Sequence, residues 1–201
     1  EIRTPMNGVV GLSELLLTTP LIDEQREYVE GIQYSADVLL RLIGDILDFS
    51  KIEAGKLDID RTAYSLRSTL LNIAEQAGAQ CRAKQLQFEL EMDPSLPDRI
   101  VGDGIRLRQI LTNLLGNAVK FTESGGRIDL GCDTVNTYVR FSIQDTGIGI
   151  PAEKLEVIFD PFVQVRAELT RTTEGTGLGL AISRDLARGM GGDIVVESTL
   201  G

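Results

Sequence analysis

The 201-residue sequence contains no histidine and only two cysteines. Without histidine, no side chain of this sequence can supply an imidazole base, an imidazole metal ligand or a histidine nucleophile. The cysteines, Cys81 and Cys132, lie far apart and are too few for a metal cluster or a disulfide framework, and they suit a reducing compartment. The sequence therefore excludes every mechanism in which one of its own histidines takes part.

Basic residues are in the minority: 20 Lys and Arg against 30 Asp and Glu leave a net charge of −10. This balance disfavours nucleic acid and anionic membranes as partners. Long hydrophobic runs are also missing, because Arg41 and Asp45 interrupt the most apolar stretch, LLRLIGDIL. No signal peptide is recognised. We expect a cytoplasmic globular fragment that makes no membrane contact.

Residues 1–60 are predicted to form two helices, because apolar residues recur at spacings of three and four on either side of Thr18-Thr19-Pro20. Asp23 is the expected N-cap of the second helix. The apolar positions are Ile2, Met6, Val9, Leu12 and Leu16, and then Val29, Ile32, Ala36, Leu39, Ile43 and Ile46. An antiparallel hairpin with this stripe cannot bury it alone, so pairing with a second copy as a four-helix bundle is favoured. The alternative is packing on its own C-terminal domain.

Residues 61–201 are predicted to mix helices and strands. Ser65 is expected to cap a helix that reaches residue 82, and Asp103 one over 105–121. The other expected elements are strands at 85–92, 127–133, 138–144 and 193–198, a short helix near 152–158 and a helix at 178–188. Short loops between interleaved elements favour a two-layer α/β sandwich. The sequence thus predicts two domains, 1–60 and 61–201, and we expect the last strand of the second domain to be incomplete.

Three polar residues of the 105–121 helix, Asn113, Asn117 and Lys120, are predicted to share one stripe, within an arc of roughly 60°. Two amides and an ammonium on one stripe can coordinate a hard cation and contact phosphate oxygens. The alternative is a solvated polar face.

Asp145 continues the alternation of Val139, Phe141 and Ile143, so its carboxylate is expected to point toward the core. There it needs a donor, and the exocyclic amine of a bound base would serve. The glycines that follow, in DTGIG, let the backbone approach a ligand closely. The alternative is a common Asp-Thr-Gly turn at the end of a hairpin.

A second glycine-rich segment, GTGLGL at 175–180, leads into a predicted helix. Exposed amides at a helix N-terminus suit a polyphosphate. A Rossmann site is disfavoured because the segment lies late in the chain, and a P-loop because no lysine follows the glycines.

Taken together and in this order, five motifs resemble those of the sensor histidine kinases. They are EIRTPMNG at 1–8, RQILTNLLGNAVKFT at 108–122, DTGIG at 145–149, FDPF at 159–162 and GTGLGL at 175–180. The resemblance covers the whole length. It implies a dimerisation and phosphoacceptor hairpin followed by the ATP-binding domain of the gyrase, histidine kinase and MutL superfamily.

The resemblance also implies roles at the nucleotide. Asn117 would hold the Mg²⁺ that bridges the phosphates of ATP, with Asn113 and Lys120 nearby. Phe121 would pack on the adenine, and Asp145 would accept from its amino group. ATP-hydrolysing relatives have a glutamate at position 113, so the amide here favours phosphotransfer over hydrolysis. Together with the phosphoacceptor-like hairpin, it disfavours a superfamily ATPase or a protein serine kinase.

Further implied residues line the phosphate path and the lid over it. These are Gly147, Gly149, Ile150, Gly175, Thr176, Gly177, Leu178 and Gly179. Arg171 would neutralise charge on the transferred phosphoryl group. Thr173 and Glu174 depart from the family's usual residues, which is the only support for a second hypothesis, a non-catalytic dimeric scaffold that binds nucleotide.

In the family, a histidine precedes the residue matched here by Glu1, so we expect the phosphoacceptor directly before Glu1 in the parent protein. Glu1 would orient or deprotonate that histidine. Thr4 would position water for dephosphorylating a partner response regulator, whose aspartate is the next phosphoryl acceptor. The exact sequence of this motif, EIRTPMNG, is frequent in hybrid kinases.

Overall fold

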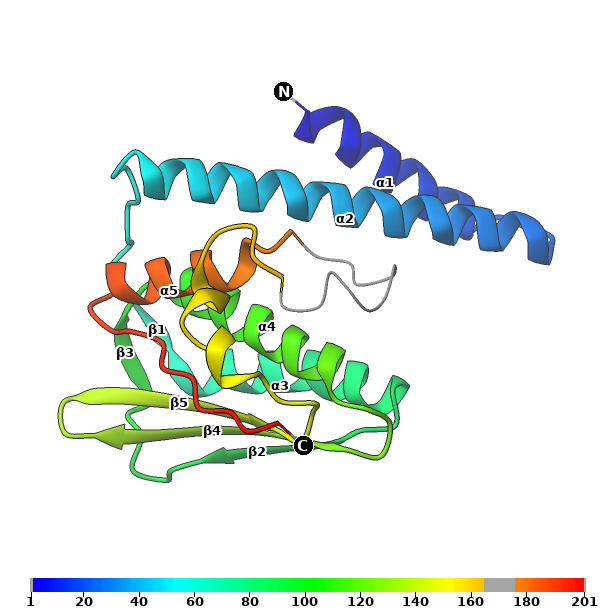
Figure 1. Ribbon diagram of the computed structural model, residues 1–201. Helices are drawn as coiled ribbons and strands as arrows, with labels where there is room; N and C mark the ends of the chain where they lie inside the picture. The colour runs from blue at the N-terminus through cyan, green and yellow to red at the C-terminus, as the bar shows by residue number, and fades with distance from the viewer. Residues whose placement is uncertain (1, 165–175, 201) are drawn as a thin grey trace. The chain divides into compact units, whose positions relative to one another are not determined.

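The computed structural model describes residues 2–164 and 176–200, and the chain divides into two compact units, Glu1–Lys56 and Leu57–Gly201 (Figure 1). Three of the predicted site residues, Glu1, Arg171 and Gly175, lie outside the described residues, as do Thr173 and Glu174. Within the described ranges, no helix combines the length and apolar character needed to cross a membrane.

The first unit is the predicted helical hairpin, formed by α1 (Arg3–Leu17) and α2 (Asp23–Glu53). The hydroxyls of Thr18 and Thr19 each donate to a carbonyl of the last turn of α1, at 2.7 Å, and so help to end that helix. The prediction that Asp23 caps α2 is wrong by one residue. Ile22 is the N-cap, and its backbone N–H donates to Gln25 Oε1 at 3.2 Å, which supplies the capping bond instead.

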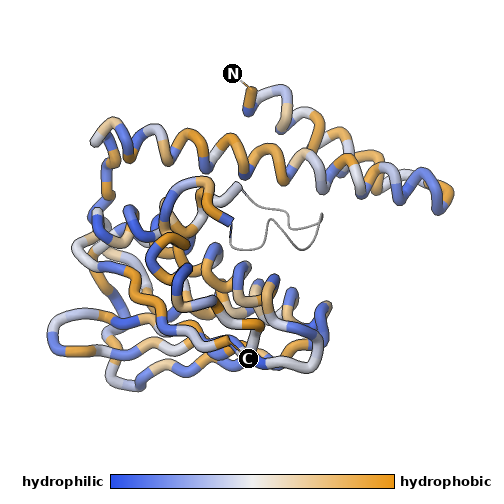
Figure 2. Tube along the Cα trace, viewed as in Figure 1, coloured by the Kyte–Doolittle hydropathy of each residue, from blue (hydrophilic) through white to orange (hydrophobic). Residues whose placement is uncertain are grey.

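The apolar stripe of the hairpin is only partly buried. Val29 and Ala36 are buried, whereas Leu12, Ile32 and Ile46 are 65%, 50% and 53% exposed. Figure 2 shows hydrophobic residues recurring along both helices. A single hairpin therefore leaves much of its stripe uncovered, as the sequence predicts.

The second unit is a two-layer α/β sandwich, as predicted. Its three-stranded sheet has the order β2-β4-β5, with β2 parallel and β5 antiparallel to the central strand. The strands are β2 (Gln87–Met92), β4 (Arg127–Val135) and β5 (Tyr138–Asp145), and the helices are α3 (Leu66–Ala83), α4 (Gly104–Phe121) and α5 (Gly179–Gly189). The α3 and α4 helices cover one face of this sheet (Figure 1).

The core lies between α3, α4 and β4. Its members include Leu66, Leu70, Ile73, Ala77 and Cys81 from α3, Leu107, Leu111 and Leu115 from α4, and Ile128, Leu130 and Cys132 from β4. The five α3 residues are each at most 5% exposed. Each buried leucine or isoleucine contributes about 1.5–3 kcal/mol, so this stripe fixes how the two helices lie on the sheet.

Both predicted caps of these helices are present. Ser65 Oγ accepts from the backbone N–H of Ser68 at 3.2 Å, at the start of α3. Asp103 is 6% exposed, and its Oδ1 accepts from the N–H groups of Ile105 and Arg106 at 3.1 and 3.0 Å. Its Oδ2 accepts from the N–H of Asp60 at 3.1 Å, so one carboxylate joins the start of α4 to the start of this unit.

Other elements differ from the prediction. Two short strands, β1 (Thr62–Ser65) and β3 (Arg99–Gly102), pair antiparallel and were not predicted. The expected short helix near 152–158 is a pair of 3₁₀ turns, η1 (Ala152–Lys154) and η2 (Val157–Phe159).

Residues 193–198 were predicted as a strand and are not one. They keep a strand-like alternation, with Val195 84% exposed between half-buried neighbours. The N–H of Ile194 instead makes a local bond, donating to Asp193 Oδ1 at 2.8 Å.

Candidate functional site

The polar stripe of α4 faces α5 at its midpoint. Asn113 is half-buried, and its Nδ2 donates to Ser183 Oγ on α5 at 2.9 Å. A Cβ at Gly179, the first residue of α5, would overlap Asn113 Oδ1. The missing side chain at Gly179 therefore lets the N-terminus of α5 lie directly against the Asn113 amide.

The other two residues of the stripe follow toward the end of α4. Asn117 is half-buried, and Lys120 is exposed with its Nζ 5.2 Å from the centroid of the Phe121 ring. The structure thus brings Asn113, Asn117, Lys120 and Phe121 along one helix, with the cation at its C-terminal end.

Lys84, which the sequence analysis missed, holds the end of α4. Its Nζ donates to the carbonyls of Val119 and Lys120 at 2.7 and 2.9 Å. These carbonyls belong to the last turn, where a helix lacks internal donors, and a cation there is favourable. The next residue, Gln85, has a φ of 60° and accepts at its carbonyl from the N–H of Gly125 at 3.0 Å. The position of this lysine just past a predicted helix end was the only signal of its role in the sequence. Its partner, the carbonyl of Val119, lies 35 residues further along the chain.

Asp145 ends β5, opposite Ile128 of β4. Ile128 is 0% exposed, and directly opposed residues share a face, so Asp145 lies on the helix-covered side of the sheet, as its phase predicts. The expectation of a buried carboxylate is nevertheless wrong, because Asp145 is exposed at the edge of that face. Its donor in the described structure is a backbone group: Oδ1 accepts from the N–H of Gly147 at 2.9 Å.

Gly147 brings the DTGIG loop against the end of α4. A Cβ there would lie 2.6 Å from Asp145 Oδ1 and 2.7 Å from the carbonyl oxygen of Phe121. The same carbonyl accepts from the N–H of Ile148 at 3.4 Å. The carboxylate of Asp145 and the backbone of Phe121 therefore lie on either side of a glycine that no other residue can replace without movement.

Gly149 and Ile150 contact the last described residues. Gly149 has a φ of 68°, and a Cβ on it would overlap the carbonyl of Thr199. The N–H of Ile150 donates to Ser198 Oγ at 2.9 Å. These contacts tie the end of the DTGIG loop to residues 198–199.

The GTGLGL and FDPF segments meet at Gly177. Its φ is 71°, its carbonyl accepts from the N–H of Phe162 at 3.0 Å, and a Cβ would lie 2.8 Å from Phe162 Cα. Thr176 Oγ1 accepts from the N–H of Leu178 at 3.1 Å, and Leu178 is 1% exposed. Leu178 thus anchors the start of α5 in the core while Thr176 and Gly177 turn the chain into it.

A further contact that the sequence analysis missed links η2 to α5. The guanidinium carbon of Arg184 lies 4.5 Å from the centroid of the Phe159 ring, and Arg184 Nε donates to Asp193 Oδ1 at 3.1 Å. The N–H of Ile194 and the nearby Arg184 and Arg188 hold the pKa of the Asp193 carboxyl below its usual value.

Thr4 lies in the first turn of α1, in the hairpin unit, and is exposed. The remaining predicted residues of the nucleotide site that the structure describes all belong to the second unit, around the α4 stripe, the DTGIG loop and the start of α5.

The donor set fits a nucleotide with a hard cation better than a protein-bound metal centre. In residues 2–164 and 176–200, no group of three or more His, Cys, Asp or Glu side chains is placed to hold a metal ion. Amide oxygens such as that of Asn117, completed by phosphate oxygens and water, are ligands that Mg²⁺ accepts. A Cβ at Gly147 would meet Asp145 and Phe121, and one at Gly179 would meet Asn113, so both glycines let their segments lie close against α4.

Two family models match the chain. Residues 1–55 match the His Kinase A (phospho-acceptor) domain, and residues 102–201 match the histidine kinase-, DNA gyrase B- and HSP90-like ATPase. The two matches correspond to the hairpin and to most of the α/β sandwich.

Individual proteins are similar over the same regions. The signal transduction histidine-protein kinase BarA of Escherichia coli strain K12 is 44% identical over 203 residues, which cover 98% of this chain and 22% of that protein. The crystal structure of full-length ShkA in complex with AMPPNP has a TM-score of 0.79 and 39% identity, covering 100% of this chain and 41% of that one. The catalytic domain of histidine kinase ThkA has a TM-score of 0.56 and 32% identity, covering 65% of this chain and 82% of that one. The chain therefore spans about a fifth of the length of BarA.

Proposed function

Because the chain belongs to the sensor histidine kinases and comprises the two modules of their transmitter core, we propose that it binds Mg-ATP in its second unit and phosphorylates a histidine directly before its hairpin. The observation that carries the proposal is the pair of close approaches at Gly147 and Gly179. One sets a carboxylate beside the end of α4, and the other sets a helix N-terminus beside its polar stripe. A carboxylate at one end and amides at the other match an adenine base and its polyphosphate.

The base is proposed to bind at Asp145 and Phe121. The exposed Asp145 carboxylate can accept from the exocyclic amine of adenine while Gly147 keeps it oriented. The Phe121 ring, at the end of the stripe, offers an apolar surface for the base.

The phosphates are proposed to bind between the α4 stripe and the residues that lead into α5. Lys120 and the N–H groups of the first turn of α5, which have no acceptor within the helix, favour negative charge there. Asn117, about one helical turn after Asn113, is the proposed protein ligand of Mg²⁺. This ion would neutralise phosphate charge during transfer. Gly147, Gly149, Ile150 and residues 175–179 are proposed to line the path.

The transferred group is proposed to pass from the γ-position of ATP to the imidazole of a histidine directly before Glu1. This sequence has no histidine of its own, and its hairpin matches a phospho-acceptor domain from residue 1. An imidazole nitrogen carries its own lone pair, so no carboxylate base is needed at Asn113. Glu1 is proposed to orient the imidazole, and Arg171 to neutralise charge on the phosphoryl group.

Two protein partners are proposed. A second copy would cover the exposed stripe of the hairpin, where Leu12 is 65% and Ile2 is 60% exposed. The aspartate of a response regulator would accept the phosphoryl group, and Thr4, exposed on α1, would position the water that later hydrolyses this phosphoaspartate to inorganic phosphate. Since ATP and that regulator must both be reached, we propose that this part of the protein works in the cytoplasm.

Equilibrium binding of Mg-ATP tests the nucleotide site. Asp145→Asn is expected to weaken ATP binding by about tenfold, because an amide cannot accept as strongly from an amine. Asp129→Asn, on the opposite face of the same sheet, is the matched control and is expected to bind as the unchanged chain does. Equal ATP affinity in all three proteins would overturn the assignment of Asp145.

A further inference from the structure

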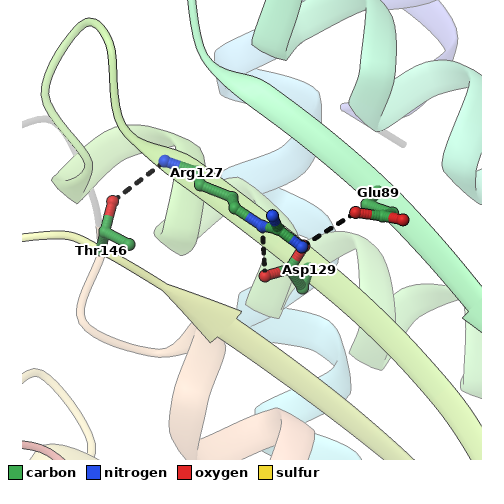
Figure 3. Close-up of polar contacts among 4 residues, drawn as sticks. All are labelled: Glu89, Arg127, Asp129 and Thr146. Carbon is green, nitrogen blue, oxygen red and sulfur yellow. Dashed lines mark hydrogen bonds and ion pairs between the residues drawn. The ribbon is translucent and has the colours of Figure 1, made fainter.

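Thr146 makes two hydrogen bonds to the first residue of β4. Its Oγ1 accepts from the backbone N–H of Arg127 at 2.9 Å (Figure 3), and its own N–H donates to the carbonyl of Arg127 at 3.1 Å. The neighbouring pair, Ile128 and Asp145, is the last pair of the β4–β5 ladder. Thr146 therefore lies at the point where the chain leaves the sheet.

The pattern of these bonds differs from an ordinary ladder in one acceptor. In an antiparallel pair of this kind, the N–H of Arg127 would donate to the backbone carbonyl of Thr146. Here the side-chain hydroxyl takes the place of that carbonyl. The peptide after Thr146 is thus free to turn, and the N–H of Gly147 turns toward Asp145 Oδ1.

Space for the hydroxyl comes from Gly126. A Cβ on this residue would lie 2.9 Å from Thr146 Oγ1 and would overlap the methyl group of Thr122. The carbonyl of Gly126 meanwhile accepts from the N–H of Gln87 at 2.9 Å, which ties this turn to β2. Gly126, which is bonded to Gln87 and leaves room for the side chains of Thr122 and Thr146, therefore fixes where the Thr146 hydroxyl lies.

We propose that Thr146 is a positioning residue: its hydroxyl fixes the exit of the chain from β5 and thereby aims the Asp145 carboxylate at the amine of the base. The inference rests on the proposed function of Asp145. Only the backbone of Arg127 takes part. The Arg127 side chain instead pairs with Asp129 and Glu89 at 2.8 Å on the outer face of the sheet (Figure 3), where its exposed ion pairs contribute little.

The test compares ATP with inosine triphosphate, which has an oxygen where adenine carries its amine. Both affinities are measured on the 201-residue chain, on Thr146→Val and on Thr146→Ser. Valine keeps the shape without the acceptor and is expected to lower the preference for ATP by roughly three- to tenfold. Serine restores the acceptor and is expected to restore the preference. Glu89→Gln removes an ion pair of Arg127 but leaves its N–H, and it is expected to keep the preference.

A second measurement needs no nucleotide. Hydrogen exchange at the backbone amides of Arg127 and Gly147 is expected to speed up in Thr146→Val and not in Thr146→Ser. In the valine variant the Arg127 amide has lost its acceptor, the Thr146 hydroxyl. The Gly147 amide, which donates to Asp145, is then held less firmly because the chain leaving β5 is no longer fixed. If valine prevents folding, Thr146→Ala against Thr146→Ser carries the same comparison.

The outcomes separate this inference from the function on which it rests. If the unchanged chain prefers ATP and Thr146→Val prefers it equally, the positioning role is wrong while Asp145 keeps its role. If the unchanged chain shows no preference, the assignment of Asp145 fails and this inference fails with it. Faster exchange at Arg127 with an unchanged preference also overturns the inference, because Thr146 then serves the sheet alone.

Discussion

Asn113 on α4 and Ser183 on α5 are joined by a hydrogen bond of 2.9 Å, from the amide Nδ2 to the hydroxyl oxygen. Ser183 is 2% exposed, so the bond is made inside the unit. It fixes the Asn113 amide with its oxygen toward Gly179, at the start of α5. Packing of the two helices and the geometry of the proposed phosphate site therefore depend on the same side chain.

Gly179→Ala is expected to weaken Mg-ATP binding by about tenfold or more, because the new methyl group overlaps Asn113 Oδ1 and that amide is held in place by Ser183. Isothermal titration with a non-hydrolysable ATP analogue measures the change. Gly44→Ala is the control, since a Cβ at this α2 residue meets nothing within 4 Å. Unchanged affinity in Gly179→Ala would show that the start of α5 does not contact the nucleotide.

Lys84→Met is expected to lower the free energy of unfolding by about 1–2 kcal/mol, since the carbonyls of Val119 and Lys120 lose a charged donor. Urea denaturation measures it. Lys154→Met, at an exposed residue of η1, is expected to have no comparable effect. A loss as large in Lys154→Met as in Lys84→Met would mean that net charge, and not the bond to α4, is responsible.

Local signals were sufficient to predict the helices of the second unit. Ser65 and Asp103 are short polar residues before apolar periodic runs, and both cap as predicted, because capping depends on neighbours in the sequence. The strands β1 and β3 were not predicted, because four-residue strands pair across more than 30 residues of chain and show no clear alternation.

The site was predictable in its residue types but not in its contacts. The phase of β5 predicted the face on which Asp145 lies, but the exposure of its side chain at the edge of that face had no signal in the local sequence. Lys84, Thr146 and Ser183 escaped notice for a similar reason: each acts through a partner that only the folded chain brings near.

Thr122→Val is expected to leave the fold intact and to raise the free energy of unfolding by about 1 kcal/mol. Thr122 is 0% exposed, and its hydroxyl has no hydrogen-bond partner among the residues that the structure describes. Valine fills the same volume without that buried polar atom. Thermal denaturation measures Thr122→Val beside Thr122→Ser. Serine keeps the hydroxyl and adds a cavity, so it is expected to be less stable than the unchanged chain. A less stable valine variant would mean that the hydroxyl has a partner.

Burial raises the pKa of the Cys132 thiol to about 11, with the charges of Asp133 and Asp93 adding to the effect. An unfolded thiol titrates near pH 8.5, so between about pH 8.5 and about pH 11 the unfolded chain releases a proton that the folded chain keeps. Stability is therefore expected to fall as the pH rises through this range. Urea denaturation at pH 8 and pH 10 should show a smaller fall in Cys132→Ala than in the unchanged chain, and equal falls would contradict this origin.

Phosphotransfer to a histidine before Glu1 is the central claim, and one labelling experiment tests it most directly. The 201-residue chain and a version with one histidine added before Glu1 are each incubated with γ-labelled ATP and Mg²⁺. The account predicts label on the histidine version alone, lost in acid and stable in base. If both versions bind nucleotide and neither is labelled, the account is contradicted and the chain is a nucleotide-binding scaffold.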